Sequence, residues 1–363
     1  MKIAFQNILN KIFLEIRSHL IKQYGANISF PNLNRLVINI TTRCNFNCPH
    51  CLREPLDADK TIKMDMPIEL FEKILKGAKK LNYKMINFTG GEPILHPQFK
   101  KLVELTCRYG YYYTIVSNGW FYQEYWPIIS ENKHHLLFLT FSIDGATANI
   151  HDQIRNQPGS FKRVIEAIKF YKEKKIRRIM MFTCLTQKNR HQIQEIISLA
   201  KDLGVDIVKF LTPITPSNFP GKKDYSLSRR DRKEILGKIK ERASMLRGQK
   251  IECQIDATIQ VGEPHGINFC YNVMRPNFYI DPAGSMHFCC NIHKVPSDRP
   301  DILKDGLEKS FLLTLDIVNE IKKRRLKDLY CNKNHPDDFY TCEYCNQNIE
   351  SVIKKVRAED KIL

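Results

Sequence analysis

The stretch LVINITTRCNFNCPHC, residues 36–51, joins a short apolar run to three closely spaced cysteines. The run LVINI at 36–40 has the length and the β-branched content of a buried strand. Cys44, Cys48 and Cys51 follow it with the spacing Cys-x3-Cys-x2-Cys. Three thiols in so short a loop are soft ligands, suited to zinc or to an iron–sulfur cluster. The sequence therefore predicts a strand that leads directly into a metal-binding loop.

Further apolar runs follow this strand at regular intervals and alternate with segments of helical period. Short buried strands that alternate with helices are typical of βα units and a parallel sheet. We expect strands at 36–40, 85–90, 112–117, 136–144, 178–185 and 207–213, and helices near 67–81, 96–109, 121–131, 159–174 and 189–203. Right-handed crossovers curl such a sheet, so the predicted fold is α/β, a partial (βα)6 barrel whose strand C-termini form the active face.

The regular alternation stops near residue 214, where PITPSNFPGKKDYSLS is rich in proline, serine and lysine. A polar helix is expected at 228–247, and seven of the twelve cysteines then lie between 250 and 345. This composition predicts a small cysteine-rich module after the barrel. The expected organisation is an N-terminal amphipathic helix and lead-in at 1–34, the barrel at 35–215, a linker and helix at 216–249, and the C-terminal module at 250–363.

Within the C-terminal module we expect a hairpin around Pro282–Ala283–Gly284 and a helix near 307–328. A module this small has little room for an apolar core, so its stability is predicted to depend on a metal. In a reducing cytoplasm, clustered cysteines indicate metal or catalytic sites rather than disulfides. Cys107 and Cys184 lie in apolar segments and are interpreted as buried, inert thiols.

The formal net charge is +18, which could attract nucleic acid or an anionic membrane. The lysines are spread along the chain, so solvated helix faces are the favoured interpretation and no nucleic-acid partner is expected. Residues 5–22 are expected to form an amphipathic basic helix, and packing against its own domain is favoured over contact with a membrane surface. Lys11, Glu15 and Arg17 interrupt its apolar run, so we expect no signal peptide and a cytoplasmic location.

Thr89–Gly90–Gly91–Glu92–Pro93 follows the second expected strand, one βα unit after the three early cysteines. The segment resembles the GGEP motif of the radical S-adenosylmethionine (SAM) superfamily, and the cysteines resemble that family's signature. The resemblance implies that the cysteines bind a [4Fe–4S] cluster with one open iron for SAM. It also implies that Gly90, Gly91 and Glu92 hold the SAM amino group: glycines admit a close backbone approach, and a carboxylate accepts from an ammonium.

Polar residues also end the third and fourth expected strands, on the face where the family binds the SAM ribose and the substrate. These candidates are Ser117, Asn118, Ser142 and Asp144. The stretch HDQIRNQPGSF at 151–161 resembles a segment of related members, in which Arg155 corresponds to a residue that pairs with the SAM carboxylate. The alternative for Arg155 is a surface arginine in a loop. Asn189 and Thr212 are weaker candidates near later strand ends.

The late cysteines show the pattern Cys-x13-Gly-x4-Cys, followed far downstream by Cys-x2-Cys. This pattern resembles the auxiliary-cluster module called SPASM, or its shorter relative called Twitch. The resemblance implies a second [4Fe–4S] cluster, and a structural zinc on the same thiolates is the alternative. The expected ligands are Cys270, Cys289, Cys342 and Cys345. Cys290 could replace Cys289, and Cys331 receives no role.

The resemblance implies reductive cleavage of SAM to a 5′-deoxyadenosyl radical, with a flavodoxin- or ferredoxin-like electron donor. The favoured reaction is oxidation of a small polar metabolite with the auxiliary cluster as electron acceptor. The alternative within the family is maturation of a ribosomal peptide by thioether formation, epimerisation or C–C crosslinking. A non-catalytic, basic iron–sulfur binding protein is the alternative of another class; the SAM-binding motifs argue against it. The sequence names neither the substrate nor a catalytic acid or base.

Overall fold

The computed structural model describes residues 35–51, 63–176, 178–212, 225–245, 251–255, 278–288, 298–331 and 341–360. The chain divides into two compact units, Met1–Leu33 and Asn34–Leu363, and the described residues all belong to the second. The expected N-terminal helix and three of the late cysteines, Cys270, Cys289 and Cys290, lie outside the described residues. In the part of the chain that is described, no helix has the length and apolar character needed to span a bilayer.

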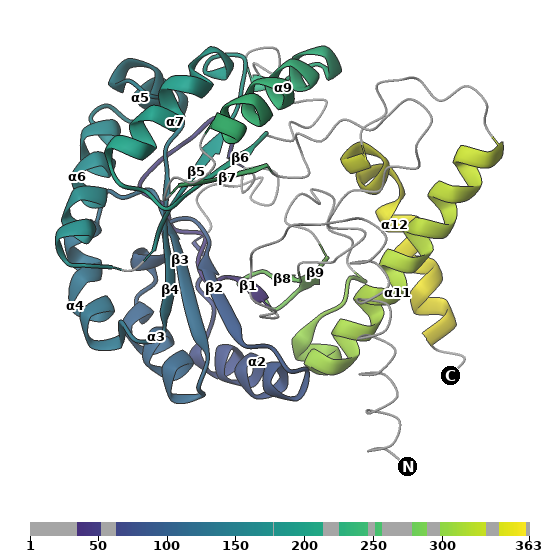
Figure 1. Cartoon of the computed structure of the whole chain (residues 1–363). Coiled ribbons are helices and arrows are strands. Elements are labelled where there is room, and N and C mark those ends of the chain that lie inside the picture. Colours follow the sequence, from purple (N-terminus) through teal and green to yellow (C-terminus); the bar gives the residue numbers. More distant parts are fainter. Residues whose placement is uncertain are drawn as a thin grey trace. The chain divides into compact units, whose positions relative to one another are not determined.

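The core of the second unit is a nine-stranded sheet in the order β7-β6-β5-β4-β3-β2-β1-β8-β9. Neighbouring strands are parallel from β7 through to β8, and only the β8–β9 pair is antiparallel. The strands are β1 Arg35–Asn39, β2 Met85–Thr89, β3 Tyr112–Ser117, β4 Leu136–Ser142, β5 Ile179–Cys184, β6 Ile207–Leu211, β7 Glu252–Ile255, β8 Tyr279–Ile280 and β9 Met286–His287. The predicted α/β class with a curled parallel sheet is confirmed (Figure 1).

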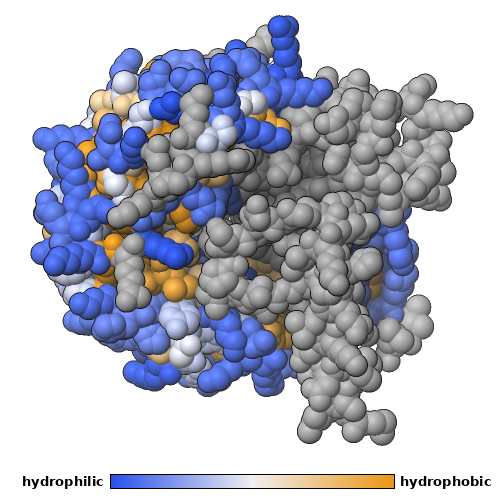
Figure 2. All heavy atoms as spheres, viewed as in Figure 1, coloured by the Kyte–Doolittle hydropathy of each residue, from blue (hydrophilic) through white to orange (hydrophobic). Residues whose placement is uncertain are grey.

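Amphipathic helices cover one face of this sheet, here called the outer face (Figure 1). They are α2 Ile68–Lys80, α3 Phe99–Arg108, α4 Tyr122–Asn132, α5 Ala148–Arg155, α6 Ser160–Glu173, α7 Ile193–Asp202 and α9 Arg229–Met245. Strand residues on the outer face pack against them: the ring of Phe88 in β2 stacks on Phe71 of α2, with 5.8 Å between centroids. Hydrophilic side chains dominate the solvent-facing side of these elements (Figure 2), as expected for amphipathic helices.

Alternate strand residues point to the other side of the sheet, here called the inner face. Val37 of β1, Asn87 of β2, Thr114 of β3 and Phe138 of β4 are partners in register and alternate with outer-face residues such as Phe88. None of these four belongs to the apolar core between sheet and helices. The inner face therefore mixes polar and apolar side chains.

The six expected strands and five expected helices all occur, with bounds that differ by a few residues. The sheet is larger than predicted, because β7 and β8 extend it at opposite ends. The hairpin expected around Pro282–Ala283–Gly284 is confirmed as β8–β9, and β8 pairs with β1. Segments assigned to the C-terminal module therefore continue the barrel sheet, and the proposed division into domains stays a prediction.

Two C-terminal helices, α11 Ile302–Cys331 and α12 Thr341–Asp360, pack against each other around an apolar cluster. The cluster contains Phe288, Leu313, Ile317, Val318, Ile321, Ile349, Val352, Ile353 and Val356. Arg357 of α12 pairs with Asp305 near the start of α11, with Nη2 and Oδ2 2.7 Å apart. The module thus has apolar packing of its own, which the prediction of a metal-dependent core did not foresee.

Candidate active site

The loop that carries the early cysteines begins at the C-terminal end of β1. Thr41 and Arg43 anchor its base: Thr41 Oγ1 donates to Asp65 Oδ1 at 2.6 Å, and Arg43 Nε lies 2.8 Å from Asp65 Oδ2. Cys44, Cys48 and Cys51 are half-buried and are not joined in disulfides. Beyond this anchored base the loop presents three soft ligands at the end of the sheet where parallel-strand proteins bind ligands.

The pKa of the Cys48 thiol is raised to about 12, mainly by burial; Arg155 opposes the rise, and the neighbouring Cys51 and Cys44 add to it. The three thiols are thus close enough to repel one another once ionised. Because iron and zinc bind thiolates, a metal that occupies this loop must displace protons from it. Metal binding here is therefore expected to be coupled to proton release.

The Gly90–Gly91–Glu92 segment lies directly against the base of the cysteine loop. Gly91 N–H donates to Thr41 O at 2.8 Å, and Glu92 N–H donates to Arg43 O at 2.7 Å. Gly90 has φ +149°, and a Cβ there would lie 2.5 Å from Thr41 O. At Gly90 the close approach is therefore to the chain's own backbone, and the expectation that a ligand approaches at Gly90 is not needed to explain this glycine.

The carboxylate of Glu92 is fully buried and ties the end of β2 to the end of β3. It accepts hydrogen bonds from Ser117 Oγ at 2.7 Å, from Asn118 N–H at 2.8 Å and from Tyr125 O–H at 2.5 Å. Burial raises the pKa of Glu92, although these three donors oppose the rise. Three of the carboxylate's lone pairs are therefore used within the chain, and the role of Glu92 toward the SAM amino group stays a prediction.

Asn118 links the third strand to the cysteine loop as well. Its Nδ2 donates to Asn45 Oδ1 at 2.9 Å, between Cys44 and Cys48. Ser142 lies half-buried at the end of β4. The structure thus brings the expected residues of the first four strands to one end of the sheet. Tyr125 was missed, because an aromatic residue on an amphipathic helix looks like an ordinary core residue.

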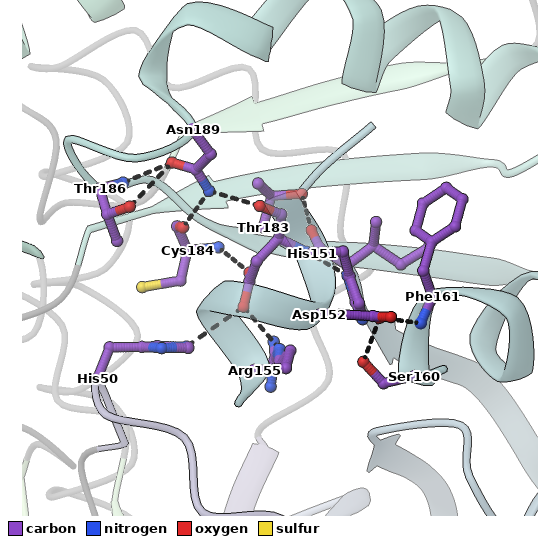
Figure 3. Close-up of polar contacts among 12 residues, drawn as sticks. His50, His151, Asp152, Arg155, Ser160, Phe161, Thr183, Cys184, Thr186 and Asn189 are labelled. Carbon is purple, nitrogen blue, oxygen red and sulfur yellow. Dashed lines mark hydrogen bonds and ion pairs between the residues drawn. The ribbon is translucent and has the colours of Figure 1, made fainter. Parts of the chain in front are cut away.

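Asp144, just after β4, is the centre of a buried polar network. Figure 3 shows its partners His50, Arg155 and Cys184 gathered around one shared carboxylate. Its Oδ2 lies 2.6 Å from Arg155 Nε and 3.2 Å from His50 Nε2, and its Oδ1 accepts from Cys184 N–H at 2.8 Å. Burial alone would raise the pKa of Asp144, but Arg155 and His50 outweigh it and hold the pKa well below its ordinary range. The carboxylate therefore stays ionised inside the protein.

Arg155 lies on α5 with its side chain only 13% exposed, so its interpretation as a surface loop residue is wrong. Burial lowers the pKa of Arg155, but Asp144, Cys48 and Cys184 together outweigh it and raise the pKa, and Cys48 is also a hydrogen-bonding partner. The guanidinium thus lies between a buried carboxylate and a cysteine of the loop. Its pairing with a SAM carboxylate stays a prediction.

His50 faces Asp144, and its ring stacks on Tyr225 with 6.2 Å between centroids. No local sequence pattern indicates this contact between His50 and Asp144. Among the described residues, no three His, Cys, Asp or Glu side chains converge as ligands of one metal ion would. The thiolates of a cubane cluster each bind a different iron, so they do not need to converge on one point.

Two further residues complete the network around Asp144. His151 Nδ1 accepts from Asp144 N–H at 3.1 Å, and burial lowers the pKa of His151 to about 4. Asn189 Nδ2 donates to Asp144 O and Cys184 O, both at 2.8 Å, so this weaker candidate supports the loop backbone. Cys184 is buried as predicted, and it also belongs to the site, because its N–H donates to Asp144 (Figure 3). Thr212 is buried at the end of β6.

Two of the expected ligands of a second cluster, Cys342 and Cys345, lie within α12, and Cys331 is the last residue of α11. Their side chains are outside the described residues, as are Cys270 and Cys289. The ligand set of the expected auxiliary cluster therefore stays a prediction.

Comparison with known proteins points to one family. Residues 38–200 match the model of the Radical SAM superfamily. The subtilosin biosynthesis protein AlbA of Bacillus subtilis is 24% identical over 51% of this chain and 40% of its own length. The tungsten-containing aldehyde ferredoxin oxidoreductase cofactor-modifying protein of Pyrococcus furiosus is 29% identical over 50% of this chain and 52% of its own. The chain thus spans about half the length of these curated relatives.

A solved structure agrees at the level of the fold. Streptococcus suis SuiB bound to its precursor peptide SuiA superposes with a TM-score of 0.62 and 17% identity, over 80% of this chain and 67% of SuiB. The matched segment 38–200 contains the cysteine loop, the Gly90–Glu92 segment and the Asp144 network. From this match, and from motifs that the fold gathers at one end of its sheet, we conclude that residues 38–200 form a radical SAM domain.

Proposed function

We propose that this radical SAM enzyme holds a [4Fe–4S] cluster on Cys44, Cys48 and Cys51 and binds SAM beside Gly90–Glu92. When bound, the reduced cluster supplies the electron that splits SAM into methionine and a 5′-deoxyadenosyl radical, which abstracts hydrogen from the substrate. One observation carries the proposal: the backbone of the Gly91–Glu92 segment is hydrogen-bonded to the base of the cysteine loop. The chain therefore holds the loop of the proposed cluster ligands and the proposed SAM-binding segment in contact.

The residues around this contact are preorganised. Glu92 fixes the ends of β2 and β3 through three hydrogen bonds, and Asp144 holds Arg155 and His50 beside the cysteine loop. Both carboxylates are fully buried. A buried and rigid surround excludes water and stray hydrogen donors from a radical reaction, which is what the protein must contribute to this chemistry.

For the substrate we keep oxidation of a small polar metabolite as the first candidate. It depends on a second [4Fe–4S] cluster on Cys270, Cys289, Cys342 and Cys345, which would take the electron left on the substrate. If these four thiolates held a structural zinc instead, there would be no second cluster to accept the electron from the substrate. A flavodoxin- or ferredoxin-like protein is the proposed electron donor.

A peptide substrate is the second candidate, and the comparisons favour it. AlbA is named for the biosynthesis of the bacteriocin subtilosin, and SuiB was solved with its precursor peptide. These two proteins, 24% and 17% identical to this chain, support a peptide as the substrate class.

The test is anaerobic reconstitution followed by measurement of iron, sulfide and 5′-deoxyadenosine release from SAM with dithionite as reductant. We expect about eight irons per chain, falling to about four when Cys44, Cys48 and Cys51 are replaced by alanine, together with loss of 5′-deoxyadenosine. Cys107→Ala is the matched control, because Cys107 lies on α3 outside the site and should leave both quantities unchanged. Release of 5′-deoxyadenosine by the triple variant would refute the assignment. About four irons that fall to none would refute the second cluster alone.

A further inference from the structure

A row of side chains crosses the inner face of the sheet at one level. Strand register places Tyr279 beside Val37, Val37 beside Asn87, Asn87 beside Thr114, and Thr114 beside Phe138. The row therefore joins the C-terminal hairpin to the first four strands of the barrel. Neighbouring strands lie about 4.8 Å apart, so one bound group can reach two adjacent members of the row.

Two adjacent members of this row carry buried polar atoms that have no hydrogen-bond partner. Asn87 is 8% exposed and Thr114 is 4% exposed, and neither Asn87 Oδ1 nor Thr114 Oγ1 is hydrogen-bonded in the described part of the chain. Buried polar atoms are normally hydrogen-bonded, because an atom that loses its bonds to water and gains no other bond destabilises the fold. Two such atoms side by side indicate a position that something else is meant to fill.

The row is also free of charged side chains. Its members are Tyr279, Val37, Asn87, Thr114 and Phe138, and Tyr279 Oη accepts from Asn39 Nδ2 at 2.8 Å. A charged group placed against Asn87 and Thr114 would lose its hydration without a counter-charge in the row. A neutral group loses much less hydration free energy when it is buried there.

The chemistry of the two atoms sets the kind of neutral group. The amide oxygen of Asn87 can only accept a hydrogen bond, and the hydroxyl of Thr114 can donate or accept. A group that satisfies both must offer a donor to Asn87, as an amide N–H or a hydroxyl does.

We propose that Asn87 and Thr114 form a substrate subsite that binds a neutral hydrogen-bond-donating group, an amide N–H or a hydroxyl. The proposal rests on the proposed function, because it assigns this subsite to the substrate of the radical reaction. An amide N–H is the group that a peptide offers, and a hydroxyl is the group that a sugar-like metabolite offers. The subsite therefore specifies the shared chemistry of both substrate candidates.

The test uses the reconstituted protein with SAM and without reductant, so that no turnover is needed. Two probes at millimolar concentration, N-acetyl-alanyl-alanine methylamide and methyl glucopyranoside, are followed by ligand-observed saturation-transfer NMR. The variants are Asn87→Leu and Thr114→Val, which remove the polar atoms at similar volume. Thr106→Val is the matched control, because its buried hydroxyl is satisfied by Leu102 O at 2.8 Å on α3, outside the site.

We expect at least one probe to bind the wild type, and Asn87→Leu and Thr114→Val to weaken that binding about tenfold or more while Thr106→Val leaves it unchanged. Binding of the dipeptide would identify an amide as the group, and binding of the glycoside a hydroxyl. We also expect the melting temperature to hold or rise in the two subsite variants, since they remove unpaired polar atoms, and to fall in Thr106→Val.

Three results would overturn the subsite: no binding of either probe to the wild type, unchanged binding in both variants, or melting temperatures of both variants that fall as in Thr106→Val. The last would mean that the two atoms are satisfied by a structural partner. Failure of the proposed function is a separate result, because it is measured as absence of 5′-deoxyadenosine from the wild type with reductant.

Discussion

At the scale of single residues, Gly90 shows how much of the site depends on close backbone approach. A Cβ at this position would lie 2.5 Å from Thr41 O and 2.6 Å from Asn39 Oδ1, and its φ of +149° is unfavourable for other residues. We expect Gly90→Ala to lower the free energy of unfolding by about 2–3 kcal/mol, because backbone strain and a steric clash act together. Chemical denaturation of the metal-free protein measures this change.

Gly110→Ala is the control for Gly90→Ala. Gly110 also has positive φ, +79°, but a Cβ added there would meet no atom of the described residues within 4 Å. The substitution should therefore cost only the conformational strain, about 1 kcal/mol. Equal losses at the two glycines would show that the contact between the Gly90 segment and the cysteine loop adds nothing to stability.

His151 makes the free energy of unfolding depend on pH, and its lowered pKa fixes the direction of that dependence. Burial lowers its pKa from 6.5 to about 4, so the folded protein keeps the ring neutral where the unfolded chain takes up a proton. As pH falls from about 6.5 to about 4, the free energy of unfolding should therefore fall, by about 3 kcal/mol in total. Above pH 7 this residue should contribute no slope.

His151→Gln tests this by denaturant titration of the metal-free protein at a series of pH values. The variant should show a shallower loss of stability between pH 6.5 and 4 than the wild type, and the same profile between pH 7 and 8.5. Parallel profiles in the acid range would mean that His151 is solvated or charged in the folded state.

At the scale of elements, the Glu92 carboxylate joins three of them: the loop after β2, the end of β3, and α4 through Tyr125. Tyr125→Phe removes one donor from a buried carboxylate, and we expect a loss of about 1.5–3 kcal/mol in the free energy of unfolding. Tyr113→Phe is the control, because its hydroxyl makes a longer bond of 3.4 Å to the neutral Asn132 O. A loss at Tyr125 no larger than at Tyr113 would contradict an anchoring role for this contact.

The elements also show what the sequence could and could not predict. Strands such as Leu136–Ser142 are continuous apolar runs, so their buried position followed from composition alone. The strand Glu252–Ile255 was missed because ECQI carries a charged and an amide residue, and its pairing with β6 is what makes it a strand. Helix Ala148–Arg155 was missed because its eight residues are too short and polar for a clear period.

The candidate site likewise contains some features that the sequence predicts and others that it does not. Cysteine spacing and the Gly90–Glu92 segment are local patterns, so the sequence contained them. The contact between Asp144 and His50 joins residues far apart in the chain, and no local pattern encodes such a contact. The ion pair between Asp144 and Arg155 runs from the end of a strand to a short helix that the sequence did not predict. The unpaired atoms of Asn87 and Thr114 became visible only once strand register placed them side by side.

At the scale of the whole molecule, the question is whether the C-terminal module folds without a metal. Helices α11 and α12 share an apolar cluster in which Ile321 and Val352 are fully buried. Burying several aliphatic side chains contributes stability that does not depend on a metal. We therefore expect amides of α11 and α12 to remain protected from hydrogen exchange after chelation of all metal, measured by mass spectrometry on the full chain.

Ile321→Ala sharpens this test, because deleting a fully buried aliphatic side chain costs about 2–5 kcal/mol of local stability. Protection in α11 and α12 should fall in this variant, with or without metal, while protection in β1–β4 stays as in the wild type. The control is Leu312→Ala, which removes a side chain on α11 that is 48% exposed and should leave protection unchanged. Loss of all protection in the two helices on chelation of the wild type would instead make the metal the organising element of the module. In that case the apolar cluster would form only after metal binding.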